Sequence, residues 1–287
     1  MLRIQIILDL GHNEIPMSGK VDQLKLYFGD PYPITDKIQI YQPTIQQIVF
    51  DYGEDSYYST LFIFIGNTTM RKLFLWENGI DWNKLSDYEL FCGLVKLLPV
   101  DQTSIFFGDI DFTTFELYEL DCEYEEEPID PDKKLTAIEK NKRAFRKFEK
   151  THTFYSQELD IEIDADTYHT IVDVMRSMTM ITPKTEYTVG KTSKELLIQE
   201  EVEKLQRATK EEDQSSLLSL ISFCLNHPGF KYKKNELREV QIYEFMDCVK
   251  RLQIYEATHA LYGGMYSGFC DTSKIPKSQF DFTRNLD

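Results

Sequence analysis

Residues Val189-Gly190-Lys191-Thr192 form the most suggestive chemical pattern in the chain. They match the end of a phosphate-binding loop, in which glycine amides and a lysine surround phosphate oxygens. Such a loop needs another glycine five positions before Gly190, so that its backbone amides stay open to the ligand, and Thr185 stands there. We therefore expect no nucleotide cofactor at this segment.

Carboxylates at alternate positions are the second candidate for chemistry. Asp109 and Asp111 form one such pair, and Asp160, Glu162 and Asp164 form another group. On a strand these side chains would share a face and could bind a divalent cation. Alternating charge is also typical of the solvent side of a half-buried strand, and no glycine-containing calcium loop accompanies either group. We predict no metal site, while a small enzyme with an unrecognised carboxylate site stays open as an alternative.

Side chains for nucleophilic or zinc chemistry are scattered along the chain. The histidines are isolated, and none has a cysteine or a second ligand at helical spacing; they are His12, His152, His169, His227 and His259. No Gly-x-Ser-x-Gly nucleophile motif occurs. The sequence therefore predicts a protein that is not an enzyme and that holds no cofactor.

A helix, a short loop and a second helix are predicted around the two tryptophans, Trp76 and Trp82. Gly79 can adopt the left-handed conformation that ends a helix, and Ser86 with Glu89 has the spacing of a capping box. We interpret the tryptophans as packing residues at this corner.

Alternating apolar residues predict strands over residues 2–6, 24–28 and 38–41, which would form a small N-terminal sheet. A further strand over 112–120 is expected to pair with one over 159–163. Helices are predicted after Thr44, whose cap would involve Gln47, over 101–107, and after Asp164 or Asp166. The mostly charged segment 194–213 indicates a solvated helix. The apolar stripes after Ile242 and after Ala257 favour two packed helices.

The fold class predicted from these patterns is α+β, with a small N-terminal sheet with helices and a mainly helical C-terminal part. Three parts are expected: an N-terminal α+β part over 1–120, a charged insertion over 121–157 and a mainly helical part over 158–287. Residues 133–150 of the insertion hold eight Lys and Arg against two Glu. They predict a charged surface helix, and docking onto a partner or an acidic patch is the alternative.

Composition limits the partners. Hydrophobic residues make up 42% and aromatic residues 13% of the chain, so a packed core is expected. The net charge of −16 opposes binding to nucleic acid and to anionic lipid, which leaves a basic or protein partner. Five widely spaced cysteines in mostly apolar surroundings are typical of buried thiols in a reducing compartment. Residues 1–10 are too short to span a bilayer, and we expect a cytoplasmic protein without a membrane partner.

Several phrases of the sequence resemble a family of tail-region proteins of siphophages and prophages of Gram-positive bacteria, usually regarded as tail assembly chaperones. The similarity covers most of residues 24–287 and is weakest over 123–155 and the first twenty residues. The phrases are GDPY at 29–32, IYQPTI at 40–45, GIDW at 79–82, SDYELF at 86–91, TSIFFGD at 103–109, GFKY at 229–232 and IYEFMDCVKR at 242–251.

This resemblance implies a non-enzymatic chaperone in the cytoplasm of the bacterial host, which binds the phage tape-measure protein or another tail protein during tail morphogenesis. An apolar groove would accept amphipathic helices of the partner. The predicted partner-binding residues are Phe245, Met246, Met265 and Phe269, because methionine adapts to many partners. A connector or baseplate protein retained in the virion is the alternative from a structural class. Core packing is the alternative for each of the four residues.

Overall fold

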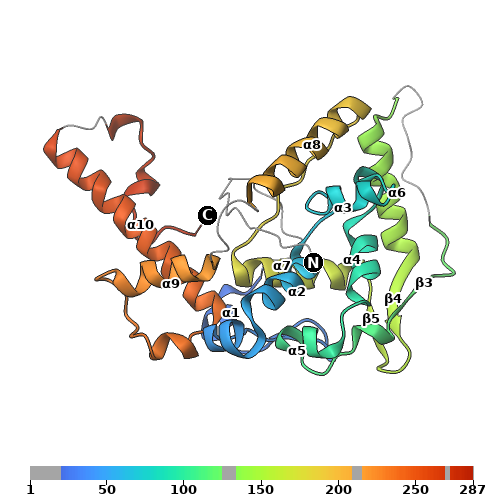
Figure 1. Cartoon of the computed structure of the whole chain (residues 1–287), viewed down its shortest axis with the longest axis horizontal. Coiled ribbons are helices and arrows are strands. Elements are labelled where there is room, and N and C mark those ends of the chain that lie inside the picture. The colour runs from blue at the N-terminus through green and yellow to red at the C-terminus, as the bar shows by residue number, and fades with distance from the viewer. Residues whose placement is uncertain (1–20, 125–133, 209–214, 269–271, 287) are drawn as a thin grey trace.

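The structure is a computed structural model that describes residues 21–124, 134–208, 215–268 and 272–286. It is an α+β fold that is mainly helical, with two small antiparallel sheets, as the sequence predicted. Figure 1 shows α7 running behind the centre, the larger sheet at one side and α10 extending away at the other. The helices are α1 (Gln23–Phe28), α2 (Glu54–Ile65), α3 (Lys72–Glu77), α4 (Asp87–Val95), α5 (Val100–Phe107), α6 (Ala137–Thr151), α7 (Ala165–Thr179), α8 (Lys191–Ala208), α9 (Ser216–Asn226) and α10 (Ile242–Ser267). The strands are β1 (Tyr32–Pro33), β2 (Gln39–Ile40), β3 (Glu116–Glu119), β4 (His152–Ser156) and β5 (Ile161–Ile163).

The N-terminal strand prediction is only partly right. Residues 24–28 belong to α1, because the Asp22 side chain accepts hydrogen bonds from the amides of Leu24 and Lys25 and so caps a helix. Of the helix residues only Leu26 is buried. The expected strand over 38–41 is confirmed as β2, which pairs with β1 in a short hairpin. The expected strand over 2–6 lies outside the described residues.

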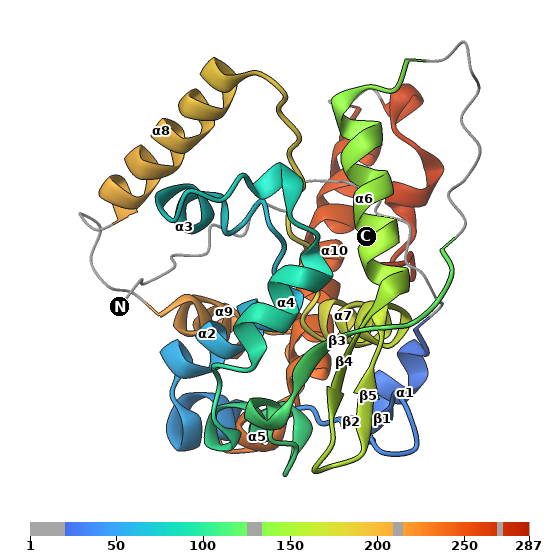
Figure 2. The same cartoon turned by 90° about the vertical axis from the view of Figure 1, so that its right-hand side faces the viewer.

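The larger sheet corrects the predicted pairing. Its strand order is β3-β4-β5, so the strands expected to be neighbours are separated by β4 (Figure 2). Residues of β4 were assigned to the charged insertion, yet Thr153 and Phe154 are buried. Phe154 pairs with Leu117 on one side and with Ile163 on the other. The run His-Thr-Phe-Tyr-Ser that starts at His152 is β-favouring, and its position next to a long charged helix masked this signal.

The predicted helix starts are confirmed by their caps. The Thr44 hydroxyl accepts from the Gln47 amide at 3.2 Å, and the Gln47 side chain accepts from the Thr44 amide at 2.9 Å. The chain then passes through a π-helix over Gln47–Tyr52 before α2. Asp164 caps α7 by accepting from the Thr167 amide. The expected helices over 101–107 and 133–150 are present as α5 and α6.

The tryptophan corner is also confirmed. α3 ends at Glu77, Gly79 has a φ of 75°, and the Ser86 hydroxyl accepts from the Glu89 amide at the start of α4. Trp82 is buried and meets the half-buried Trp76 edge to face, with ring centroids 5.9 Å apart. Their apolar neighbours are Leu75, Leu90 and Ile198. The two tryptophans therefore act as packing residues in this structure.

The main core surrounds α7, whose Ile171, Val174 and Met175 are completely buried. α7 contacts α2, α10 and β5. The same apolar cluster extends from Val21 to Leu252, so it includes residues from both outer parts of the predicted division. The three-part division stays a prediction.

The last long helix differs from the prediction. Instead of two packed helices, residues 242–267 form the single helix α10, with Gly263 and Gly264 inside it. The helix ends where Gly268 adopts a left-handed φ of 70°. The predicted solvated helix is α8, which exposes Leu196 but packs Leu197 and Ile198 against the tryptophan corner. The prediction of buried cysteines holds for Cys92 and Cys224 and is wrong for Cys122, which is exposed.

Candidate functional site

Three of the four predicted partner-binding residues, Phe245, Met246 and Met265, are described by the structure and lie along α10. Phe245 is completely buried in the main core, and Met246 is half-buried beside it. Met265 is 36% exposed near the other end of the helix. At a rise of 1.5 Å per residue it lies about 30 Å from Phe245 along the helix axis. Phe269 lies outside the described residues. α10 therefore has a buried first half and an exposed second half, residues 253–267, which we call the α10 arm.

Met246 lines a small pocket between α2, α7, α9 and α10. The pocket holds about 20 Å³, which is room for one water-sized group. Its lining is neutral and mostly apolar, and consists of Tyr57, Tyr58, Thr179, Ile181, Ser216, Leu220, Ile242 and Met246.

The two tyrosines of this pocket have different polar surroundings. The Ser216 hydroxyl donates to Oε1 of Glu54 and reaches the Tyr58 hydroxyl at 3.4 Å. The Tyr57 hydroxyl is buried without a hydrogen-bond partner among the described residues. Burial raises the pKa of Tyr57 far above its usual value and raises the pKa of Tyr58 to about 12. Both phenols are therefore neutral at physiological pH, so the pocket offers hydrogen bonds and apolar contact rather than a charged catalyst.

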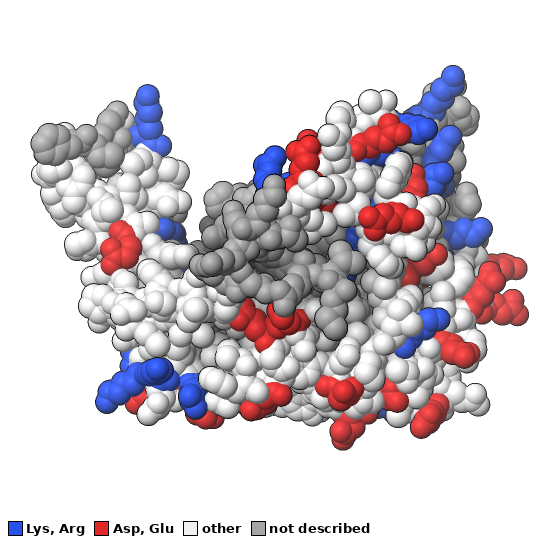
Figure 3. Space-filling view, in the orientation of Figure 1, with Lys and Arg blue, Asp and Glu red and all other residues white. Residues whose placement is uncertain are grey.

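The α10 arm exposes aromatic side chains and carries little charge. Tyr255 is 49% exposed and Tyr266 is 81% exposed. Glu256 is the one acidic residue between Gln253 and Ser267, which include no Lys or Arg. Figure 3 shows this part of the surface as mainly uncharged.

One face of the α10 arm is covered by the chain that follows it. The Tyr262 hydroxyl donates to the carbonyl of Phe280, and Nη1 of Arg284 donates to the Thr258 hydroxyl at 2.9 Å. The rings of Tyr262 and Phe282 stack at 5.9 Å. These contacts pack the following chain against the arm, while Tyr266 and Met265 stay accessible. Sequence reasoning named Met265 but missed Tyr255 and Tyr266, although the scarcity of charge after Gln253 was a usable signal.

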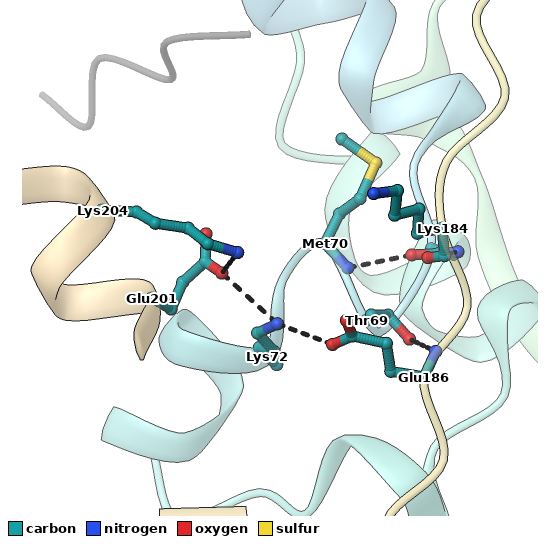
Figure 4. A network of polar contacts seen from close by, with 8 residues as sticks. Thr69, Met70, Lys72, Lys184, Glu186, Glu201 and Lys204 are labelled. Atoms are coloured by element: carbon teal, nitrogen blue, oxygen red, sulfur yellow. Dashed lines mark hydrogen bonds and ion pairs between the residues drawn. The ribbon is translucent and has the colours of Figure 1, made fainter. Parts of the chain in front are cut away.

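The segment that resembles a phosphate-binding loop is held in a different arrangement (Figure 4). The buried Lys72 side chain donates to Oε2 of Glu186 at 2.9 Å and forms an ion pair with Glu201 of α8 at 3.3 Å. Residue 185, where the loop would need a glycine, is a threonine whose hydroxyl accepts from Asn67. The segment leading into α8 is thus bound to the region before α3, and Lys191 points into solvent with 85% exposure.

The alternating carboxylates serve local structure. Asp111 caps a 3₁₀ turn by accepting from the Thr113 amide, and Asp164 caps α7. Asp160 pairs with Lys37 at 2.6 Å, and this bond keeps the pKa of the Asp160 carboxyl below its usual value. Glu162 accepts from the Thr153 hydroxyl. Across the described ranges, no group of three or more His, Cys, Asp or Glu side chains is arranged to hold a metal ion.

The described histidines are each engaged locally. His227 bonds Glu256 at 2.9 Å, His169 faces Glu149 at 3.7 Å, and His152 and His259 stack on Phe148 and Tyr255. His12 lies outside the described residues. None of the helices that the structure describes is both long and apolar enough to cross a membrane. Comparison with protein-family models, with curated proteins and with solved structures found no match.

Proposed function

We propose that this chain is a non-enzymatic chaperone of phage tail assembly, which binds the tape-measure protein in the cytoplasm of the bacterial host and leaves before the particle is complete. The observation that carries the proposal is the α10 arm, a helical segment that exposes Tyr255, Met265 and Tyr266 and carries little charge. The resemblance of seven phrases between residues 29 and 251 to tail assembly chaperones supports the choice of partner.

The physical basis is helix-on-helix docking. Tyrosine and methionine supply large apolar contact areas, and methionine adapts its shape to different partner side chains. An amphipathic helix of the tape-measure protein would lie with its apolar face on the arm. The net charge of −16 would attract the lysine-rich face of that helix and speed its association.

Co-expression with the tape-measure protein of the same phage or prophage tests this assignment. The double variant Met265→Gln with Tyr266→Gln keeps the net charge and removes two exposed apolar anchors. We expect its affinity for the partner to fall about tenfold or more, because each such side chain contributes about 1.5–3 kcal/mol when it becomes buried. The soluble fraction of the tape-measure protein should fall with it. Leu196→Gln on α8 is the matched control, since Leu196 is 56% exposed and lies off the arm.

Two further measurements separate this function from its alternatives. Raised salt should slow association with the partner but should lower the affinity only slightly. Salt screens the long-range attraction that speeds the encounter more than it weakens buried apolar contacts. Mass spectrometry of purified, infectious virions should find this chain absent. Stoichiometric presence in the particle would refute the chaperone assignment and favour a connector or baseplate protein.

A further inference from the structure

The edge strand β3 leaves main-chain groups open on one side. The Leu120 amide donates to the Thr151 carbonyl at 2.7 Å. Because the bonding residues alternate along an antiparallel strand, Tyr118 and Glu116 also bond to β4. The N–H and C=O groups of Leu117 and Glu119 therefore point away from β4. Among the described residues no other strand pairs with β3 on that side. All four residues of the strand are exposed, so the edge is accessible to an incoming segment.

Acidic side chains follow this open edge. Glu116 and Glu119 lie on β3, and Asp121 and Glu123 follow in the exposed chain directly after it. Within the ranges that the structure describes, none of these four carboxylates forms an ion pair. Figure 3 shows acidic side chains gathered at the right-hand border of the molecule, where Figure 1 places β3. The edge therefore combines unpaired backbone groups with carboxylates that form no ion pair among the described residues.

We propose that β3 binds an extended, lysine- or arginine-rich peptide segment, which adds a fourth strand to the sheet. Strand addition supplies main-chain hydrogen bonds to Leu117 and Glu119, and the carboxylates favour a partner segment with positive charge. Pairing with a second copy of β3 is opposed by the same charges, because it would bring glutamates of two chains close together across the edge. This surface is separate from the α10 arm, so the proposal does not depend on the function proposed above.

The two faces of the sheet define the pattern of the segment. Leu117 lies on the face of Phe154, and Glu116 and Tyr118 lie on the face of Tyr155, whose ring is 6.2 Å from that of Tyr118. Leu117 and Tyr118 are each 41% exposed and offer apolar contact at two adjacent positions. Glu116 and Glu119 flank them. A segment with two β-branched residues between two basic ones matches the edge in either direction.

A synthetic peptide with the core Lys-Val-Val-Lys, blocked at both ends, is the probe. It should bind the full chain, and hydrogen exchange should slow at the amides of Leu117 and Glu119 when it is bound. The matched control is the same peptide with both central valines replaced by proline, which keeps the charge and removes the valine backbone donor that faces β3 in either register. We expect this control to bind at least about fivefold more weakly, by fluorescence anisotropy at physiological salt.

Charge reversal at single positions of the protein distinguishes binding at the β3 edge from attraction by the overall negative charge. Glu119→Lys should weaken binding of the valine peptide about fivefold. Glu200→Lys, at an exposed position of α8, changes the net charge equally and should weaken it much less. Equal binding of the valine and proline peptides, equal effects of the two reversals, or unchanged exchange at Leu117 and Glu119 would each overturn the proposal. Dimerisation through β3 in the absence of peptide would also overturn it.

Discussion

The Tyr57 hydroxyl is buried beside the small pocket without a described partner, whereas Tyr88, which is also buried, donates its hydroxyl to the Ile163 carbonyl at 2.7 Å. A buried polar atom that loses its hydrogen bonds to water and gains none in return costs about 1–3 kcal/mol. The two tyrosines therefore form a matched pair, in which replacement by Phe should change the free energy of unfolding in opposite directions.

Replacing Tyr57 by Phe should raise the free energy of unfolding by about 1 kcal/mol, because the ring stays packed and the unpaired hydroxyl is removed. Replacing Tyr88 by Phe should lower it by about 1–3 kcal/mol, because the Ile163 carbonyl is left unpaired. Urea unfolding of the two variants measures both changes. A loss of stability in the Tyr57→Phe variant would mean that its hydroxyl has a hydrogen-bond partner in solution.

The pH dependence of stability has a residue-scale source in His169. The Glu149 carboxylate of α6, 3.7 Å from the ring, raises the pKa of His169 above its usual value near 6.5, with further support from Asp173 and Asp166. Because the folded pKa is higher than the unfolded one, the contribution of His169 to stability is complete below about pH 6.5 and is lost as pH rises through the folded value.

An NMR titration of the His169 ring should therefore give a midpoint above that of the unfolded chain. The Glu149→Gln variant should bring the midpoint down toward the ordinary value, because it removes the negative partner. An unchanged midpoint in this variant would assign the raised pKa to Asp173 and Asp166 instead.

At the scale of elements, α8 depends on a few contacts made at its base. Lys72 joins Glu186 and Glu201, and Lys194 pairs with Asp81 at 2.6 Å. Leu197 and Ile198 add apolar contact with the tryptophan corner. The Lys72–Glu201 and Lys194–Asp81 ion pairs connect α8 to the corner rather than to the main core.

Replacing Lys72 by Met should release α8 without unfolding α7, because two carboxylates lose their shared cation while the main core stays intact. We expect amide hydrogen exchange in α8 to accelerate about tenfold or more, and exchange in α7 to stay unchanged. Lys191→Met is the control, since Lys191 is 85% exposed and pairs only at 3.9 Å with Glu195. Equal effects of the two substitutions would show that the buried cation does not hold the helix.

Elements that depend on local signals were predicted well, and elements that depend on distant neighbours were not. Caps at Thr44, Ser86 and Asp164 involve residues within three positions, so their spacing in the sequence is sufficient. β4 was missed because its burial comes from β3 and β5 on its two sides. The residues of α1 alternate in a way that also suits a strand, and the cap from Asp22 decides between them.

The prediction of two helices after Ile242 was wrong for a similar reason. Two glycines inside a helix cost about 2 kcal/mol relative to alanine, yet Gly263 and Gly264 lie within α10. The helix continues because the later segment packs along it, through Tyr262 with Phe280 and Thr258 with Arg284. A continuous helix separates Met246 from Met265, so only Met265 and its exposed neighbours remain on the arm.

At the scale of the whole molecule, residues near the beginning of the described chain are joined directly to the start of α10. Nε2 of Gln241 donates to the carbonyl of Gly29, across 212 residues of sequence. The Ile45 amide donates to Val240, and the Ile242 amide donates to Pro43. These bonds place the first turn of α10 against the chain that leads into α2.

These bonds can form only after residue 241 has been synthesised. At about 5–20 residues per second, a ribosome takes about 10–40 s to travel from Gly29 to Gln241. During that interval the apolar residues of α2 have left the ribosome before α7 and α10 exist to cover them. A chain proposed as a chaperone thus exposes apolar residues of its own until most of its synthesis is complete.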